Sequence, residues 1–260
     1  MKKILKNSAK TLSSDLACEF IRAKKIKQDD ILSLSEVYLN EENAKLIGKN
    51  KGKYVTLDTS AVIEGREEYY NRIASAIKNE LKKLVVGNTI LVVGLGNYKL
   101  EADSLGSKTC SMLNVTRKIV DSEFCVCSVT PGVIGATGIE SFEVVKGVCK
   151  TVEPSTIIVV DSLCAGSVSR LLTSFQISNA GIVPGSGVEN HRMELSSRTL
   201  GVNVISLGVP TVVYMSTIIK EYSGIPGERN IVVSPKDIDF MIKDCSIIIA
   251  NAINSLFLTQ

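Results

Sequence analysis

Apolar residues along this chain gather in short runs that are typical of buried β-strands. Most of the runs are built from Ile, Val and Leu, which favours strands that are covered on both faces. The segment 52–58 instead alternates apolar and polar side chains, which is typical of a strand with one buried face. From these patterns we expect strands at 52–58, 89–93, 124–128, 156–160, 177–183 and 202–207.

Between the predicted strands, apolar residues are spaced as in amphipathic helices. Within 62–84 they recur at intervals of three and four residues, which predicts a helix with one apolar face. We expect further helices at 140–149 and 192–200. Ser234 and Pro235 have the residue types of an N-cap and a first helical position, so a long C-terminal helix should begin there.

Apolar strands that alternate with helices predict an α/β fold, with a mostly parallel twisted sheet flanked by helices. We expect a single domain of this kind over residues 51–260. Residues 1–50 are polar and basic with weak periodicity, so they are predicted to form an N-terminal arm with at most a short helix.

Composition narrows the possible functions. The net charge of +3 is too small to indicate a nucleic-acid or membrane partner. The lysines near the N-terminus are not followed by the apolar segment of a signal peptide, and no stretch resembles a membrane span. We therefore expect a cytoplasmic protein with no membrane contact and no direct nucleic-acid partner. The 7 cysteines include no CxxC pair and there is 1 histidine, so we expect neither a zinc site nor a cofactor.

Two aspartates are the main candidates for chemistry. Asp103 follows the strand predicted at 89–93, and Asp161 follows the strand predicted at 156–160. Each has an ordinary explanation, since an aspartate can cap a helix or form a salt bridge. Because the carboxyl ends of parallel strands meet at one edge of a sheet, we expect the two side chains to share a crevice there.

Two carboxyl groups in one desolvated site cannot both ionise easily, so the pair should retain one proton. The ionised partner can then take a proton from water, while the protonated partner donates to a carbonyl oxygen or a leaving amine. Such a pair can hydrolyse a peptide bond without a covalent intermediate.

Other active sites have weaker support in the sequence. Gly94-Leu95-Gly96 resembles the start of a dinucleotide fingerprint, but its third glycine would fall at Lys99, and a tight turn explains the motif. A cysteine mechanism would need Cys164 with His191, although a buried cysteine and an exposed histidine are the ordinary reading. An all-carboxylate metal site on the two aspartates remains an open alternative.

Two glycine-rich loops, 131–138 and 181–187, lie beyond predicted strands. Such loops let a main chain approach closely and present N–H groups to a carbonyl or an anion. They could also be turns in a tightly packed sheet. With the turn after the strand at 89–93, they supply the candidate substrate-binding residues Gly94, Gly96, Asn97, Gly132, Gly135, Thr137, Gly138, Pro184, Gly185, Ser186 and Gly187.

Several blocks of the sequence closely resemble those of the germination protease family, also called spore proteases. They include PGVIGATGIES, ISNAGIVPGSGVENHR, LGVPTVV, GLGNYKLEADSLG and VVDSLCAGSVSRL, and they are collinear over nearly the whole chain. The resemblance implies that Asp103 and Asp161 are the catalytic pair. It also implies a fold similar to that of hydrogenase maturation proteases, and an endopeptidase that degrades small acid-soluble spore proteins in the spore core during germination.

The family's members are typically tetrameric zymogens that remove their own N-terminal segment. Their substrates are cut after an acidic residue and before a large apolar one, and the segment SDLACE at 14–19 resembles that context. We therefore predict self-cleavage between Asp15 and Leu16, with residues 1–15 as a propeptide. The alternative is a plain helix start capped by Ser14 or Asp15.

Two other functions remain compatible with the sequence. One is a maturation-type protease on the same fold that trims a different protein, with a metal at the carboxylates. The other is an inactive homologue that only binds peptides.

Overall fold

The computed structural model describes residues 14–119, 122–186, 192–225 and 231–257 of the chain. These residues build a 9-stranded sheet in the order β1-β2-β3-β7-β8-β6-β4-β5, and β9 pairs with β8. The strands are β1 (Lys24–Gln28), β2 (Ser33–Leu39), β3 (Gly52–Asp58), β4 (Thr89–Gly94), β5 (Cys125–Val129), β6 (Thr156–Ala165), β7 (Ser174–Ser178), β8 (Asn203–Tyr214) and β9 (Val232–Val233).

The sheet has a parallel half and an antiparallel half. β5, β4, β6 and β8 pair in parallel, whereas β8, β7, β3, β2 and β1 pair antiparallel. The predicted α/β class is confirmed, but the expectation of a mostly parallel sheet was correct only for the half around β4 and β6. In the other half, β1 and β2 are joined only by residues 29–32, which is too short for the crossover that a parallel pair requires.

Residues 24–39 belong to the sheet, so the prediction of an N-terminal arm over residues 1–50 was wrong for this stretch. β1 is exposed along its whole length and therefore has no apolar pattern to detect. β2 buries only Leu34, Val37 and Leu39, and these pack against the neighbouring part of the sheet and helix α2 (Glu41–Ile47).

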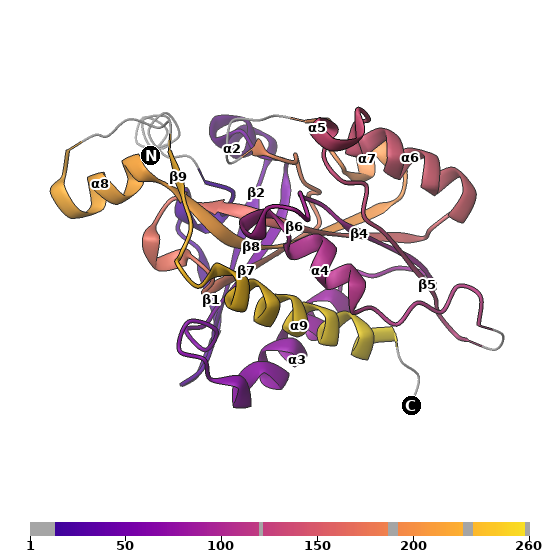
Figure 1. Ribbon diagram of the computed structural model, residues 1–260, viewed down its shortest axis with the longest axis horizontal. Coiled ribbons are helices and arrows are strands. Elements are labelled where there is room, and N and C mark those ends of the chain that lie inside the picture. Colours follow the sequence, from indigo (N-terminus) through magenta and orange to yellow (C-terminus); the bar gives the residue numbers. More distant parts are fainter. Residues whose placement is uncertain (1–13, 120–121, 187–191, 226–230, 258–260) are drawn as a thin grey trace.

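Helices cover both faces of the sheet (Figure 1). α3 (Tyr70–Lys82), α4 (Leu105–Ser111) and α9 (Ile238–Phe257) pack on one face and enclose the largest apolar cluster. α2 and α6 (Ser141–Val152) lie on the opposite face. The remaining helical segments are η1 (Ala17–Glu19), η2 (Glu67–Tyr69), η3 (Glu101–Asp103), α5 (Ile134–Thr137), η4 (Val168–Arg170), α7 (Ser197–Leu200) and α8 (Met215–Ser223).

β6 and β8 both continue beyond their predicted ends at residues 160 and 207. Gly208 and Pro210 both lie inside β8. Leu163 of β6 is opposite Pro210 and Cys164 is opposite Val212, so β8 carries one extra residue in a β-bulge. Bulges accommodate proline because its nitrogen cannot donate a ladder hydrogen bond.

Other boundaries also moved. The helix predicted within 62–84 begins only at Tyr70, and the one predicted at 192–200 is reduced to Ser197–Leu200. The strand predicted at 177–183 spans 174–178 instead. Its beginning was missed because polar residues there interrupt the apolar run. The C-terminal helix begins at Ile238 instead of Ser234 and Pro235, since those residues carry the chain away from β9 before the helix starts.

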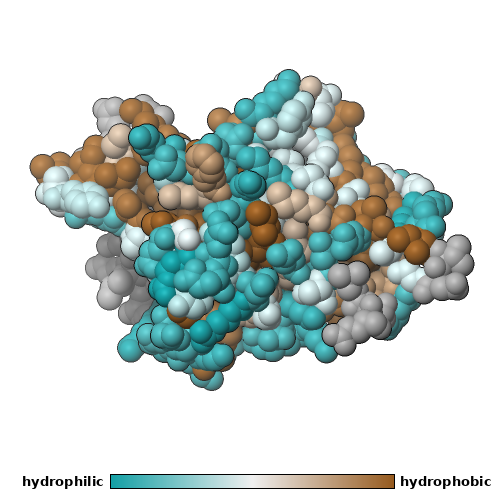
Figure 2. Space-filling view, turned by 60° about the horizontal axis from the view of Figure 1, so that its bottom comes forward, coloured by the Kyte–Doolittle hydropathy of each residue, from teal (hydrophilic) through white to brown (hydrophobic). Residues whose placement is uncertain are grey.

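Among the described residues, α9 is the one helix whose length and apolar composition would suit a membrane span. In this fold its apolar side lies on the sheet, with Ile242, Ile249 and Ile253 buried in the main cluster. In contrast, α8 projects from one end of the molecule without a buried residue, and Figure 2 shows apolar surface there. Exposed apolar side chains in and after α8 include Ile219 and Ile225.

The close packing of α4 against the sheet leads to a prediction about Gly106. A methyl group added at Gly106 would lie 2.4 Å from the main-chain oxygen of Leu95 and 2.6 Å from that of Val160. Gly106→Ala should therefore lower the free energy of unfolding by about 2–3 kcal/mol in urea denaturation.

Gly147 in α6 is the matched helical control, because an added methyl there meets nothing within 4 Å. Gly147→Ala should raise the free energy of unfolding by about 0.5–1 kcal/mol, the ordinary gain from replacing glycine in a helix. Equal effects at the two positions would contradict the packing described here.

Candidate active site

A polar row crosses the face of the sheet that carries α2 and α6. Asp161 of β6 is opposite Gly208 of β8, Gly208 is opposite Gln176 of β7, and Gln176 is opposite Thr56 of β3. Residues directly opposite one another on paired strands present their side chains on the same face. On the adjacent row of the same face, Ser206 and Ser178 lie between Val159 of the apolar cluster beneath α6 and Tyr54 of the one beneath α2.

Asp161 lies inside β6, although the sequence suggested that the strand would end before it. Its side chain is almost fully buried, with 6% exposed. One carboxylate oxygen accepts a hydrogen bond of 2.9 Å from the main-chain N–H of Ser162. Burial raises the pKa of Asp161 well above its usual value, and the nearby charges of Asp103 and Asp15 raise it further.

Asp103 ends η3, just before α4. Its carboxylate accepts a hydrogen bond of 2.8 Å from the main-chain N–H of Asn97, and α4 has no side-chain cap. Asp103 therefore does not cap the helix that follows. Burial raises the pKa of Asp103, against the opposing effect of the bond from Asn97.

Two local features hold Asp103 in place. Gly96 has a φ of +100°, and a methyl group there would lie 2.1 Å from the main-chain oxygen of Asp103. Thr211, the extra residue of the β8 bulge, donates a hydrogen bond of 2.6 Å from its side chain to the main-chain oxygen of Ala102. The bulge thus ties the loop that carries Asp103 to the central strand.

Asp103 and Asp161 line the same cavity, whose volume is about 350 Å³. The structure thus brings together the two aspartates that the sequence singled out. Since Asp161 is the more deeply buried and has the more strongly raised pKa, it is the better proton holder of the two. Among the described residues, no group of three or more His, Cys, Asp or Glu side chains is arranged to hold a metal ion.

The predicted substrate-binding residues fall into four sets. Gly96, Pro184 and Gly185 line the cavity, and Ser186 contacts Asp15 beside it. Gly94 packs against Gly106, and Asn97 supports Asp103 through its main chain. The cavity lining does not include Gly132, Gly135, Thr137 or Gly138, although their neighbours Val133 and Ile134 belong to it. Gly187 lies outside the described residues, as does His191.

The alternative cysteine nucleophile is disfavoured by its surroundings. The Cys164 side chain is buried, and this burial raises the pKa of the thiol to about 12. A cysteine acts as a nucleophile in its thiolate form, which such an environment suppresses at neutral pH.

The N-terminal segment 14–19 is docked beside this cavity. The main-chain N–H of Asp15 donates to the carbonyl of Cys164, and the N–H of Cys164 donates to the Asp15 carboxylate, both at 2.9 Å. Ser186 donates to the other carboxylate oxygen at 2.7 Å. Leu16 and Ala17 are fully buried, and η1 begins at Ala17 without a side-chain cap.

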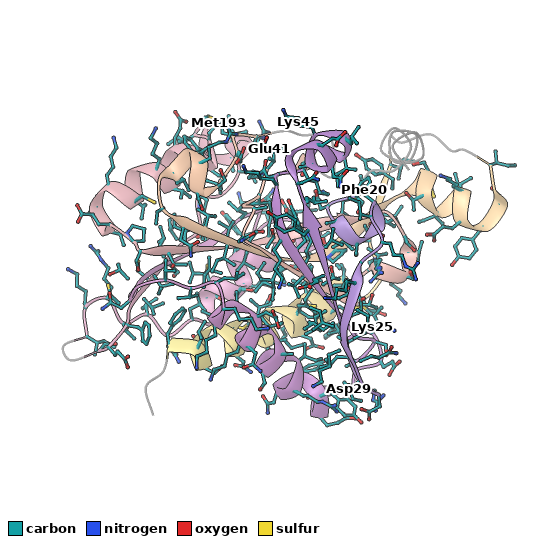
Figure 3. The ribbon with its side chains drawn as sticks, turned by 180° about the vertical axis from the view of Figure 1, so that it is seen from behind. Phe20, Lys25, Asp29, Glu41, Lys45 and Met193 are labelled. Atoms are coloured by element: carbon teal, nitrogen blue, oxygen red, sulfur yellow. The ribbon has the colours of Figure 1, made fainter. Side chains whose placement is uncertain are left out.

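Figure 3 shows Phe20, directly after η1, beside α2 with its Glu41 and Lys45. Phe20 packs on the apolar cluster that includes Ala17 and residues of α2. The N-terminal segment is therefore an integral layer over the antiparallel half of the sheet.

Lys49 and Gln176 both bind this segment, although the sequence analysis assigned neither of them a role. Lys49 donates from its ammonium group to the carbonyl of Ser14 at 2.9 Å, and burial lowers the pKa of Lys49 although Asp15 and Glu19 oppose this. Gln176 contacts the main chain on either side of Leu16. The available signal for Gln176 was a long polar side chain within the apolar run SFQIS.

The raised pKa of Asp161 predicts a pH-dependent gain in stability from Asp161→Asn. In the unfolded chain Asp161 ionises freely above its pKa of about 4. In the folded chain the same ionisation costs free energy because the carboxyl group is buried, so rising pH favours the unfolded state. The variant should therefore gain stability over the wild type as the pH rises from 4 to 7.5. The gain should be about 1.4 kcal/mol for each unit by which folding raises the pKa.

Urea denaturation at both pH values measures this gain. Asp237→Asn, at an exposed position, controls for the loss of one negative charge. A stability difference between Asp161→Asn and wild type that is the same at pH 4 and pH 7.5 would show that Asp161 ionises as freely in the folded chain as in the unfolded one.

Comparison with known proteins identifies relatives of this chain. A family model described as germination protease matches residues 2–223. Germination proteases of Clostridium perfringens and Caldanaerobacter subterraneus are each 36% identical to this chain, over 89% and 83% of it and 86% and 81% of their own lengths. That of Priestia megaterium is 40% identical over 73% of this chain and 55% of its own length.

Among solved structures, the [NiFe] hydrogenase maturation protease HycI from Thermococcus kodakarensis aligns with 66% of this chain and 97% of its own. The TM-score of this alignment is 0.38 and the sequence identity is 16%. The family is therefore assigned from the sequence, because the family model and the germination proteases match most of this chain. This chain belongs to the germination protease family.

Proposed function

We propose that this peptidase is an endopeptidase that hydrolyses peptide bonds with a water molecule activated by Asp103 and Asp161. The observation that supports the proposal is the presence of two buried carboxyl groups at one cavity, both with raised pKa. Such a pair holds a proton more readily than exposed carboxyl groups do and can exchange it with a substrate in the same site.

In the proposed mechanism, ionised Asp103 accepts a proton from the water as its oxygen adds to the carbonyl carbon. Protonated Asp161 donates its proton to the carbonyl oxygen. Collapse of the tetrahedral intermediate then breaks the C–N bond, and the proton taken up by Asp103 passes to the leaving nitrogen. The hydroxyl proton of the intermediate returns to Asp161, so the pair ends with the single proton with which it began.

We propose small acid-soluble spore proteins as the substrates, cleaved in the spore core during germination. Membership of the germination protease family supports this assignment. The contacts of Asp15 are compatible with it, because Ser186 and the N–H of Cys164 both donate to an acidic side chain at this site. We also propose that the protein is made as a homotetrameric zymogen, as the family resemblance implies.

Self-cleavage between Asp15 and Leu16 is part of the same proposal. Asp15 lines the cavity of the two aspartates, and its charge contributes to the raised pKa of Asp161. Both observations support a bond next to Asp15 as the one that the pair would cut.

Separate substitutions test the aspartate pair. Asp103→Asn and Asp161→Asn should each lower kcat on an acid-soluble spore protein by at least about 10³-fold, because each removes one partner of a proton exchange. Cleavage is followed by mass spectrometry of the fragments, with circular dichroism as a check of folding. Asp237→Asn is the matched control and should retain full activity.

The outcomes separate the competing functions. Full activity in either active-site variant would refute the paired-aspartate mechanism. Activity that is lost on treatment with a chelator would instead favour a metal-dependent maturation-type protease. Binding of the spore protein by the unmodified chain without fragments would favour an inactive peptide-binding homologue.

Self-cleavage is tested by N-terminal sequencing after incubation of the full chain at acid pH. The wild-type chain should acquire an N-terminus at Leu16, and Asp161→Asn should keep Met1 because it lacks the proton donor. An enzyme that cleaves spore protein while its own N-terminus is still Met1 would rule out the processing step.

A further inference from the structure

Gln176 forms hydrogen bonds to the peptide main chain on both sides of the Asp15–Leu16 bond, and this pair of bonds is called the Gln176 grip below. Its side-chain amide group donates a hydrogen bond of 2.9 Å to the carbonyl oxygen of Asp15. Its side-chain carbonyl accepts one of 2.8 Å from the main-chain N–H of Ala17. Both bonds go to main-chain atoms, so the same grip is available to any extended peptide whatever its side chains.

The position of Gln176 in the sheet makes this grip rigid. Gln176 lies on β7 inside the sheet and is only 7% exposed, so packing restricts its side chain. It shares the polar row with Asp161, and Gly208 lies between the two. Since adjacent strands are about 4.8 Å apart, the Cα atoms of Gln176 and Asp161 lie roughly 10 Å apart.

Gly208 leaves room for the side chain of Leu163, which packs over it between Asp161 and Gln176. A methyl group there would lie 2.6 Å from the side chain of Leu163 and 2.9 Å from the main-chain oxygen of Asp161. Without that methyl, the Leu163 side chain occupies the space between the carboxyl group of Asp161 and the carboxamide of Gln176. Asp15 lines both the cavity of Asp161 and the smaller cavity beside Gln176, so a peptide chain that passes over Leu163 can direct its carbonyl at the carboxamide.

We propose that Gln176 binds the carbonyl oxygen of the peptide bond to be cleaved and stabilises the charge that develops on it. This inference rests on the proposed peptidase function and assigns a further residue to the same site. As water adds to the carbonyl carbon, its oxygen gains negative charge, and the N–H bond from Gln176 strengthens. The bond to the N–H of Ala17 fixes which carbonyl faces the aspartates.

Gln176→Met tests this role, because methionine has a similar shape but makes neither hydrogen bond. The variant should lower kcat by about 10²-fold, with a smaller change in KM, since the lost bond is stronger in the transition state than in the bound substrate. The substrates are the chain's own N-terminus and a synthetic peptide with the sequence of residues 10–22. Gln28→Met, on the exposed strand β1, is the matched control.

Gln176→Glu separates the two bonds. Its carboxylate can still accept from the N–H of Ala17 but cannot donate to the Asp15 carbonyl, so kcat should fall as in Gln176→Met. Equal kcat in wild type, Gln28→Met and both Gln176 variants would overturn the inference and leave the proposed function intact.

Hydrogen exchange gives a readout that needs no cleavage. In full-length chains that also carry Asp161→Asn, Gln176→Met should speed amide exchange at Ala17 by at least about tenfold, because a lost bond of about 1.4 kcal/mol opens the site by that factor. Gln28→Met should leave this exchange unchanged. Unchanged exchange in Gln176→Met would overturn the grip itself. A wild-type chain that cleaves neither substrate would refute the proposed function. The exchange result would still show whether Gln176 holds the main chain at Ala17.

Discussion

The burial of two carboxyl groups in one site is the constraint on which the rest of this structure depends. A carboxylate that leaves water loses solvation, and a second one nearby adds repulsion, so the folded chain favours a shared proton. Asp161 experiences both effects inside a central strand, with Asp103 across the same cavity. The surrounding apolar clusters must supply the stability that this arrangement removes.

Small residues and one bulge make the arrangement possible. Gly96 and Gly106 let the loop before α4 lie directly on β4 and β6, and the β8 bulge turns Thr211 toward that loop. Gly208 plays a similar part on the other side of Asp161 by leaving room for the side chain of Leu163. Each feature removes bulk or a ladder hydrogen bond beside the carboxyl pair, as is common where a sheet builds a functional site.

The sequence predicted what depends on local patterns and missed what depends on strand pairing. The apolar runs that became β4 and the first half of β6 were clear, and the expectation that the two aspartates lie close together followed from them. β1 was missed because an exposed edge strand has no apolar pattern. Gln176 and Lys49 were missed because their role comes from contact with Ser14, Asp15 and Ala17, far away in sequence.

The docked N-terminal segment also connects substrate recognition with the proton balance of the site. The charge of Asp15 is held by Ser186 and the N–H of Cys164, and the same charge raises the pKa of Asp161. Under the proposed function, an acidic residue before the cleaved bond does two things when it binds: it fills this subsite and it favours the protonated form of Asp161. A neutral residue would do neither, because it brings no charge within reach of Asp161. A preference for acidic residues would then act on the chemical step as well as on binding, since the substrate itself helps to keep on Asp161 the proton that it donates to the carbonyl oxygen.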